Sequence, residues 1–505
     1  MAFKIFRRRN VYNDNPEDNI EISRTLSDNL NILKEQFRDC ADIVMSSLNI
    51  SDGTSACIIY VSNIIDTNLV QRDVLPTLLR LKADHLSKLK DTNIFPTVRS
   101  SIAYTLEIVI DRVLKANTVV LIDGNDFALC FDLKNIESRD ATEPEVEKII
   151  KGQHDGFVES ITKNIALIRK KIAISKLKVK MLTLGKRSKN DVALLYIEDI
   201  ANPEIVKRVE ERLKNIEIDN INSAGFIEQL TSDNPYSLFP QYQGTERVDK
   251  AIANLMEGRI VIFVGNTPVS LIVPVNFFQF FQTPDDYNIS FLYGSFLRLL
   301  RFFGSSIAIL LPALYIAILT YHYQAVPLSL ITPLAESRSR VPFPPIIEAM
   351  IMEISFELLR EASIRLPTSL APTIGIVGGL VIGQTAIQAG IVSNIMVIIV
   401  GITAIATFVM PQYDMGLFFR IGRFVSMLSA AIFGAVGIVI FLLYVLAHLV
   451  TLESYGQPYF QPIAPFKLKD MKDTFFRLPL KMYDSRPEAT LPVDKTRGRG
   501  NSKRK

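Results

Sequence analysis

The sequence predicts a two-lobed α/β cytoplasmic domain followed by an α-helical polytopic membrane domain. Three observations support this division. Acidic and basic residues dominate the chain before about Asp286, whereas long apolar runs crowd residues 296–450. Patterns of strand, Gly-Asn turn and strand occur twice in the charged part. The apolar runs of the second part approach 20 residues, which is the length that an α-helix needs to cross a bilayer.

Shifts in composition divide the 505-residue chain into five segments, and this length allows more than one core. Residues 1–24 are basic and polar and lack the apolar core of a signal peptide, so we expect a disordered terminus in the cytoplasm. Residues 25–150 form the first lobe. Residues 151–288 form a linker helix and the second lobe. The membrane domain covers residues 289–455, and a basic cytoplasmic tail covers residues 456–505.

The two lobes share a pattern of elements. Residues 60–70 align with residues 196–206, and each segment is typical of an apolar strand followed by a capped helix, with Asn202 as the expected N-cap of the second. Residues 120–131 resemble residues 260–272 in the same way, each with two strands around a Gly-Asn turn. We therefore predict internally repeated strand-helix-helix-hairpin units. The alternative is that common α/β patterns match by chance.

The segment between the lobes is strongly basic. Residues 161–180 alternate lysine and arginine with aliphatic side chains. This pattern indicates either a helix that rests on anionic lipid or on an acidic partner, or a connecting helix with a solvated face. Both interpretations stay open from the sequence, and neither favours binding to nucleic acid.

Signals of catalysis or of cofactor binding are scarce. Residues 184–188 imitate the end of a phosphate-binding loop, but the first glycine of that loop would fall at Lys180. Cys40, Cys57 and Cys130 match no metal or redox spacing, and we expect them to be buried in a reducing compartment. The four histidines are isolated from one another. We therefore expect a non-enzymatic chain with no cofactor and no metal site.

Four apolar runs are long enough, or nearly so, to cross a bilayer: residues 296–320, 371–391, 395–410 and 424–450. The second and third runs are so close that a tight hairpin must join them. Basic residues before the first run and in the tail place both ends inside, which requires an even number of crossings. Four crossings satisfy this condition if the amphipathic helix 346–366 lies along or dips into the outer face. If that helix crosses, another run must not.

An acidic stripe lies on this amphipathic helix, beside sequence of membrane-spanning length. At 100° per residue, Glu353, Glu357, Arg360 and Glu361 gather on one side. Carboxylates that face a wet cavity attract cations, so we predict an ion path along these four residues, with Arg360 pairing to set the closed state. The alternative is that Glu357 and Arg360, or Glu361 and the arginine four positions on, neutralise each other on a surface helix.

Glycines repeat at every fourth position in the next run, at Gly375, Gly379 and Gly383. Such a flat ridge lets another helix approach closely, either within the chain or in a neighbouring copy. The ridge could act as a gate that moves, and the alternative is that it only packs tightly against another helix. Lipid disfavours polar groups, so three side chains of the same run are expected to face protein or water: Gln384, Thr385 and Gln388.

Several segments together resemble one known family. They resemble the A subunits of the GerA-type spore germinant receptors, and the similarity extends over roughly residues 11–466. Residues 151–157 depart from the usual Arg-Gly-Pro-Arg/His-Glu-Gly-Phe of the family. The segments that carry the resemblance are residues 187–203, 240–247, 257–262, 342–345, 356–362, 364–367 and 374–384.

The resemblance implies a subunit of a nutrient receptor in the inner membrane of a bacterial endospore. In this family the A subunit works with a transporter-like B subunit, which carries the nutrient pocket, and with a lipoprotein C subunit. The A subunit is expected to form a ring that conducts monovalent cations when nutrient binds. The alternatives are a relative of a stage V sporulation protein, a non-conducting membrane scaffold, or a secondary transporter, although the membrane part lacks the paired inverted halves of transporters.

Overall fold

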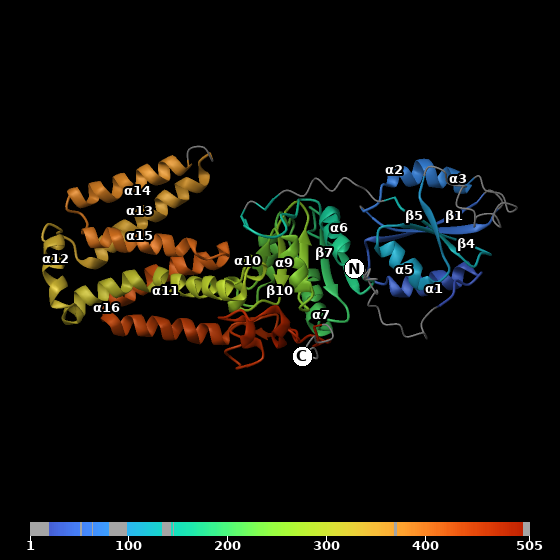
Figure 1. Cartoon of the computed structure of the whole chain (residues 1–505). Helices are drawn as coiled ribbons and strands as arrows, with labels where there is room; N and C mark the ends of the chain where they lie inside the picture. Colours follow the sequence, from blue (N-terminus) through green and yellow to red (C-terminus); the bar gives the residue numbers. More distant parts are fainter. Residues whose placement is uncertain are drawn as a thin grey trace, which may run out of the picture.

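The computed structural model describes residues 20–50, 53–62, 64–79, 98–133, 143–144, 146–367 and 371–497. Most of the predicted disordered terminus, residues 1–19, lies outside the described residues. The chain is elongated, with the first lobe at one end, the second lobe in the middle and a group of long helices at the other end (Figure 1).

The first lobe is a five-stranded antiparallel sheet between two helical layers, with strand order β1-β2-β4-β5-β3. Alternate residues of β2 face opposite sides, so Cys57 and Ile59 pack with α1 and α5, whereas Ile58 packs with η1 and α3. Its elements are α1 (Leu26–Gln36), β1 (Ile43–Asn49), β2 (Ser55–Val61), α2 (Thr67–Leu69), η1 (Val70–Val74), α3 (Leu75–Leu79), β3 (Ser100–Ala103), α5 (Leu106–Leu114), β4 (Thr118–Ile122) and β5 (Ala128–Phe131).

The second lobe is also a five-stranded antiparallel sheet, with strand order β6-β7-β9-β10-β8. Helices α6 and α9 cover one face, and α7 and α8 cover the other. Its elements are α6 (Ile161–Lys171), β6 (Leu177–Leu184), β7 (Asn190–Ile197), α7 (Pro203–Lys214), α8 (Ala224–Thr231), β8 (Gln243–Thr245), α9 (Val248–Leu255), β9 (Ile260–Val264), β10 (Ser270–Val273), η4 (Phe277–Phe281) and α10 (Asp285–Asn288).

The two sheets have the same strand order when their strands are counted from the start of each lobe. The segments aligned in sequence fall on equivalent elements, because residues 60–70 end β2 and lead into η1, and residues 196–206 end β7 and lead into α7. Both Gly-Asn turns join antiparallel strands, β4 to β5 and β9 to β10. Asn202 caps α7 by accepting a hydrogen bond from the backbone N–H of Glu204, as the sequence predicts.

The basic segment 161–180 is not one helix, because α6 ends at Lys171 and the chain continues into β6. Two of its cations hold the lobes together. Arg169 is completely buried, and its Nε lies 2.7 Å from a carboxylate oxygen of Asp42 in the first lobe. Lys178 is also buried and donates to two backbone carbonyls at and just beyond the end of α1. These contacts favour a connecting segment over a free basic surface.

The helical part begins directly after α10. Two of its helices, α11 and α16, carry stretches long and apolar enough to cross a membrane, and α15 is a shorter apolar helix. For part of α14 only the backbone is described. The elements are α11 (Phe291–Tyr321), η5 (Tyr323–Ala325), α12 (Leu328–Arg338), α13 (Pro345–Arg365), α14 (Ala371–Gln388), α15 (Asn394–Phe408), α16 (Tyr413–Thr451) and, in the tail, β11 (Glu453–Ser454), β12 (Gln457–Pro458), η6 (Asp470–Asp473), η7 (Leu480–Met482) and η8 (Glu488–Thr490).

The predicted fourth run, residues 424–450, is not one straight helix. The backbone of α16 leaves the helical region at Gly434, where φ is 61° and ψ is −139°. A Cβ placed on Gly422 would lie 3.6 Å from the ring of Phe441. A straight helix would separate these two residues by about 28 Å. Helix α16 therefore consists of two antiparallel arms that meet at Gly434.

The end of α11 binds the backbone groups that this break leaves open. The Tyr321 hydroxyl donates to the carbonyls of Ala431 and Ile432, at 2.9 Å each. The backbone N–H of Ala435 donates to the ring nitrogen Nε2 of His322 at 3.3 Å. Helix ends need such partners because their terminal N–H and C=O groups have none within the helix. The reversal in α16 is therefore built against α11.

The long helices alternate in direction. Helices α11, α14 and the first arm of α16 lead away from the second lobe, whereas α13, α15 and the second arm return toward it (Figure 1). The α13–α14 pair lies on the outside of the group. Both ends of the helical part therefore lie beside the second lobe. The chain therefore runs along the helical group an even number of times when α13 is included, because α16 contributes two runs.

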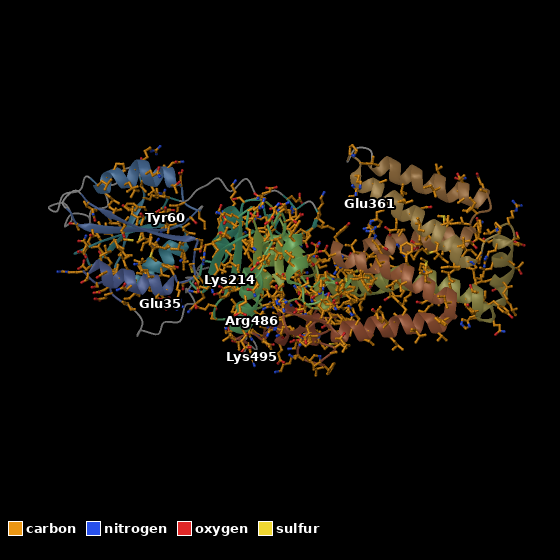
Figure 2. The ribbon with its side chains drawn as sticks, turned by 180° about the vertical axis from the view of Figure 1, so that it is seen from behind. Glu35, Tyr60, Lys214, Glu361, Arg486 and Lys495 are labelled. Carbon is orange, nitrogen blue, oxygen red and sulfur yellow. The ribbon has the colours of Figure 1, made fainter. Side chains whose placement is uncertain are left out.

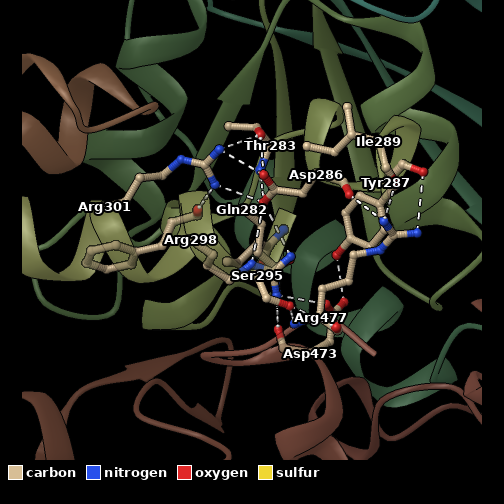
Figure 3. Close-up of polar contacts among 12 residues, drawn as sticks. Gln282, Thr283, Asp286, Tyr287, Ile289, Ser295, Arg298, Arg301, Asp473 and Arg477 are labelled. Atoms are coloured by element: carbon tan, nitrogen blue, oxygen red, sulfur yellow. Dashed lines mark hydrogen bonds and ion pairs between the residues drawn. The ribbon is translucent and has the colours of Figure 1, made fainter. Parts of the chain in front are cut away.

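A group of charges ties the base of α11 to the second lobe and to the tail, and we call it the junction (Figure 3). Asp286 of α10 is completely buried and pairs with Arg298 at 3.4 Å and with Arg301 at 2.8 Å. Arg298 also pairs with Asp473 of the tail at 2.8 Å. Arg477 of the tail donates to the backbone carbonyl of Asp286 at 2.6 Å. The second lobe, the base of α11 and the tail, which is distant in sequence from both, thus meet at Asp286.

Replacing Asp42 by Ala is expected to destabilise the lobes by about 3–5 kcal/mol, because Arg169 would remain as a buried charge without its carboxylate. Unfolding of the full chain in detergent by denaturant, followed by tyrosine fluorescence, measures the effect. Asp111→Ala is the matched control, since Asp111 pairs with Lys115 on the surface of the same lobe. A shift for Asp42→Ala no larger than that of the control would contradict the prediction.

Replacing Asp286 by Asn is expected to loosen the tail, because Arg298 and Arg301 would lose the carboxylate that they share. Cleavage of the tail by trypsin should become faster by about tenfold or more, since local opening then costs less free energy. Limited proteolysis of the full chain measures the rate. Asp484→Asn, at an exposed position of the tail, should leave it unchanged, and equal rates for both variants would refute the role of Asp286.

Candidate functional site

A group of enclosed charges in the helical part lies between α13 and the first arm of α16. Glu353 is 1% exposed and Arg423 is 3% exposed, and their side chains lie 3.2 Å apart. Glu357 accepts a hydrogen bond from Arg423 at 3.0 Å and further hydrogen bonds from Arg420. We call these four residues the charge cluster. It holds two carboxylates and two guanidinium groups, so its formal charge is zero.

Helical spacing explains how the charge cluster forms. Glu353 and Glu357 are four positions apart on α13, and Arg420 and Arg423 are three positions apart on α16, so each pair lies on one face of its helix. The hydroxyl of Thr403 on α15 lies 3.3 Å from Glu353 and donates to it. Charges of either sign are costly in an apolar interior unless they are paired and hydrogen-bonded. Each buried acidic side chain of the cluster therefore needs a basic partner to offset the cost of its burial, and each basic side chain needs an acidic one.

The predicted four-residue stripe is divided in the structure. Glu361 lies outside the charge cluster, near the end of α13 closest to the lobes (Figure 2). It pairs with Arg365 on its own helix at 2.7 Å, and both side chains are exposed. The guanidinium of Arg360 lies 5.1 Å from the ring centre of Phe408. The partners of Glu353 and Glu357 are thus the arginines of α16 instead of Arg360.

A further buried acid lies on α13 outside the predicted stripe. Glu348 is completely buried, pairs with Arg338 of α12 at 3.2 Å and accepts from the backbone N–H of Ser393 at 3.0 Å. Ser393 is the N-cap of α15, and a carboxylate is stabilised at the N-terminus of a helix. The partners of Glu348 were not predictable, because α12 and α15 reach it only in the folded chain.

The predicted glycine ridge on α14 is only partly covered. A Cβ placed on Gly375 or on Gly379 would meet nothing within 4 Å, whereas one on Gly383 would meet Val397 of α15 at 3.4 Å. Only one of the three glycines is therefore used for packing within the described part of this chain. The three polar side chains of the same helix are exposed on the isolated chain: Gln384, Thr385 and Gln388.

The remaining candidate chemistry is limited. Among the described residues, no three His, Cys, Asp or Glu side chains gather in a way that could hold a metal ion. Cys40, Cys57 and Cys130 are free thiols buried in the first lobe or at its edge, as the sequence predicts. Burial raises the pKa of Cys57 and of Cys130 to about 11, so both thiols stay protonated near neutral pH.

Comparison with known proteins places these features in a family. The model of the Bacillus/Clostridium GerA spore germination protein family matches residues 31–489. A solved structure, the N-terminal domain of the A subunit of the Bacillus megaterium spore germinant receptor GerK3, is 30% identical. The match covers 52% of this chain and 99% of the chain in the solved structure, with a TM-score of 0.42.

Curated relatives match along nearly the whole chain. Spore germination protein A1 of Bacillus subtilis (strain 168) is 39% identical over 465 residues, which is 91% of this chain and 95% of that protein. Spore germination protein GerLA of Bacillus cereus is 38% identical, covering 94% of this chain and 98% of that protein. The uncharacterized membrane protein YfkQ of Bacillus subtilis (strain 168) is 38% identical, covering 93% of each. The chain therefore belongs to the GerA family of spore germination proteins.

Proposed function

We propose that this chain is the A subunit of a nutrient receptor of bacterial spores, and that it forms a cation channel that opens when nutrient binds. The names of its relatives support a role in spore germination. The charge cluster between α13 and α16 is the observation that carries the channel proposal. Ionisable side chains inside a membrane are costly and typically line ion pathways.

The proposed closed state is the one in which the charge cluster is complete. Arg420 and Arg423 then neutralise Glu353 and Glu357, so these carboxylates attract no cation. An opening movement separates α13 from the first arm of α16, and water replaces the arginines as the partner of the carboxylates. Carboxylates exposed to water in a narrow path select cations. In this mechanism the arginines of α16 take the role that the sequence suggested for Arg360.

The proposed membrane topology has six passes, with the lobes and the tail on the cytoplasmic side of the spore inner membrane. The even number of passes supports this arrangement, since both ends of the helical part lie beside the second lobe. The basic residues of the tail agree with a cytoplasmic location under the positive-inside rule. Helix α13 then crosses the bilayer with the others, and the hairpin of α16 supplies two passes.

The proposed assembly is a ring of identical chains that meet through α14. Gly375 and Gly379 on its outer face have open space in front of them, and glycine ridges let helices of neighbouring chains approach closely. The exposed polar side chains of α14 support a partner there, because lipid disfavours them. By family resemblance, the further partners are a transporter-like B subunit that carries the nutrient pocket and a lipoprotein C subunit. We also propose that the chain has no catalytic role.

A non-conducting scaffold is the main competing function. The charge cluster is formally neutral, so it could act only to hold α13 and α16 together. A relative of a stage V sporulation protein with the same architecture would assist the receptor in a similar way, and a secondary transporter would instead move its substrate through alternating access. Conductance of the purified oligomer in liposomes separates the channel from these alternatives.

Replacing Glu353 and Glu357 together by Gln is expected to slow nutrient-triggered cation release from spores by about tenfold or more, a change equivalent to ~1.4 kcal/mol in the barrier. The physical reason is that the open path loses the charges that attract cations. Potassium release after addition of nutrient measures the effect at matched protein levels. Glu336→Gln, exposed on α12, is the control, and unchanged release in the double variant would exclude the proposed path.

A charge-balanced variant separates conduction from folding. Glu357→Gln combined with Arg420→Gln removes one acid and one base, so no unpaired charge remains. A channel should lose cation conductance in liposomes while its oligomer stays intact. A scaffold predicts that no variant conducts, and that this variant still supports germination.

Replacing Gly379 by Leu is expected to weaken self-association, because the larger side chain would occupy the open space along the ridge of α14. Crosslinking in spore membranes measures the fraction of oligomer. Gly401→Leu tests the same change on α15, where an added Cβ also meets nothing within 4 Å. If crosslinked oligomers persist unchanged in the Gly379 variant, then the ridge is not an assembly surface.

A further inference from the structure

A stretch of the tail, residues 466–482, exposes large apolar side chains, and we call it the tail surface. The exposed fractions of these side chains range from 52% to 73%. Apolar side chains gathered on a surface in this way mark a site of contact with another molecule or with a membrane. The side chains are those of Phe466, Leu468, Phe476, Leu480 and Met482.

The same stretch is basic. It holds four lysines and one arginine against two aspartates, which gives a net charge of +3. Lys472 and Lys481 are exposed, and neither forms an ion pair within the described part of the chain. The side chain of Lys469 is 75% exposed and lies 3.6 Å from Glu488. The tail surface therefore presents ammonium groups beside its apolar side chains.

The two aspartates of the stretch are occupied within the protein. Asp470 accepts hydrogen bonds from the backbone N–H groups of Glu488 and Ala489, at 3.1 Å each. Asp473 pairs with Arg298 in the junction at 2.8 Å. The exposed charge of the tail surface is consequently that of its lysines.

A loop within the tail surface packs against the base of α11. The backbone N–H of Leu478 donates to the carbonyl of Lys472 at 3.3 Å and closes this loop. The ring of Phe475 lies 5.0 Å from the ring of Phe302 on α11. The hydroxyl of Ser295 on α11 donates to the backbone carbonyl of Arg477 at 3.0 Å, and both residues appear in Figure 3. The loop is thus fixed beside residues 295–302.

This part of α11 also exposes apolar side chains. Phe296 is 58% exposed and Phe303 is 65% exposed. Under the proposed topology these side chains face lipid. Phe476 directly follows the packed Phe475 and is 55% exposed at the same level of α11. The tail lies beside the ends of α11 and α16 that are closest to the second lobe (Figure 1), which is where the membrane would meet the cytoplasm.

We propose that the tail surface lies on the cytoplasmic face of the membrane and binds anionic lipid headgroups. Phe476 inserts at the boundary between headgroups and acyl chains, and Lys469, Lys472 and Lys481 lie beside the phosphates. Apolar and basic side chains together are typical of segments that bind in this interface. The long apolar stems of lysine also let the ammonium group reach the headgroups from apolar surroundings. This proposal rests on the proposed membrane topology.

An acidic face of another protein is the other macromolecular surface that these charges would fit. The position of the loop favours lipid, because Phe476 lies beside the exposed apolar side chains of α11. A protein that covered the loop would have to displace lipid from the same place.

Lipid binding acts on the junction. Asp473 and Arg477 belong to the loop, and they hold the side chain of Arg298 and the backbone carbonyl of Asp286. Lipid that keeps the loop in place therefore stabilises the contact between the tail and the base of α11. The lipid composition of the membrane would in this way influence the first long helix.

A tryptophan substitution tests the position of the loop, because the chain has no tryptophan of its own. The Phe476→Trp chain is reconstituted in vesicles of phosphatidylcholine and phosphatidylglycerol, brominated near the headgroup end of the acyl chains. Its fluorescence should shift to shorter wavelength and should be quenched about twofold or more by the brominated lipid. Tyr104→Trp is the control, since Tyr104 is 51% exposed on the first lobe and should not be quenched.

A second substitution separates this proposal from the proposed topology. Leu443 is 60% exposed on the second arm of α16, so Leu443→Trp should be quenched by lipid brominated deep in the acyl chains. Quenching of Leu443→Trp without quenching of Phe476→Trp would overturn the proposal and leave the topology intact. If neither variant is quenched, the topology and the proposal both fail.

Replacing Lys469, Lys472 and Lys481 together by Gln tests the role of charge. Chymotrypsin measures access to the tail, because its preference for aromatic residues is unaffected by the loss of lysines. Adding phosphatidylglycerol to phosphatidylcholine vesicles should slow cleavage of the parent tail by about tenfold, and most of this protection should disappear in the variant. High salt should weaken the protection of the parent chain.

A control variant removes the same charge from the first lobe, which lies far from the long helices (Figure 1). It should keep the full protection by phosphatidylglycerol. Its substitutions are Arg24→Gln, Lys34→Gln and Lys115→Gln, all at exposed positions. Equal cleavage of the parent tail in both lipids would overturn the proposal, and so would full protection of the tail variant. Fluorescence of Phe476→Trp typical of water in either lipid would instead indicate a surface left open for a protein.

Discussion

A charged side chain that is shut off from water needs an opposite charge beside it, and such pairings join every part of this protein. Arg169 and Asp42 join the two lobes, Asp286 joins the second lobe to α11, and the charge cluster joins α13 to α16. The first and third pairings bridge segments that are distant in sequence, whereas Asp286 and Arg301 are only 15 positions apart. These buried ions add directional contacts to the apolar clusters that also join the second lobe, the helices and the tail.

The buried ion pairs act together with apolar packing at the same boundaries. The net contribution of the ion pairs to stability is small, because desolvation offsets most of the attraction. Removing one partner is nevertheless strongly destabilising, because the other charge is then buried without compensation. Apolar side chains pack across two of the same boundaries, where the second lobe and the tail meet α11 and α16, and where α13 meets α16. A movement that separated α13 from α16 would break both this packing and the ion pairs of the charge cluster.

Local patterns were the source of the successful predictions. The strands on either side of the two Gly-Asn turns follow from apolar runs around each turn, and the start of α7 follows from Asn202 before a proline. The extent of α6 was not predictable, because its basic residues continue smoothly into β6. The reversal at Gly434 was hidden within an apolar run that is long enough for one helix. At that break the Tyr321 hydroxyl donates to two backbone carbonyls and His322 accepts from the N–H of Ala435, so backbone groups that the broken helix leaves open have partners.

The sequence by itself determined which side chains share a face. The spacing of Glu353 and Glu357 on α13 and of the glycines on α14 is a property of one helix, and helical geometry is the same whatever surrounds it. The tertiary structure alone decided which faces meet. It brought Arg420 and Arg423 to the acidic face, left Glu361 at the surface, and gave the buried Glu348 the N-terminus of α15. The physical reason is that these contacts join residues far apart in the chain, whose meeting depends on how all the helices pack together.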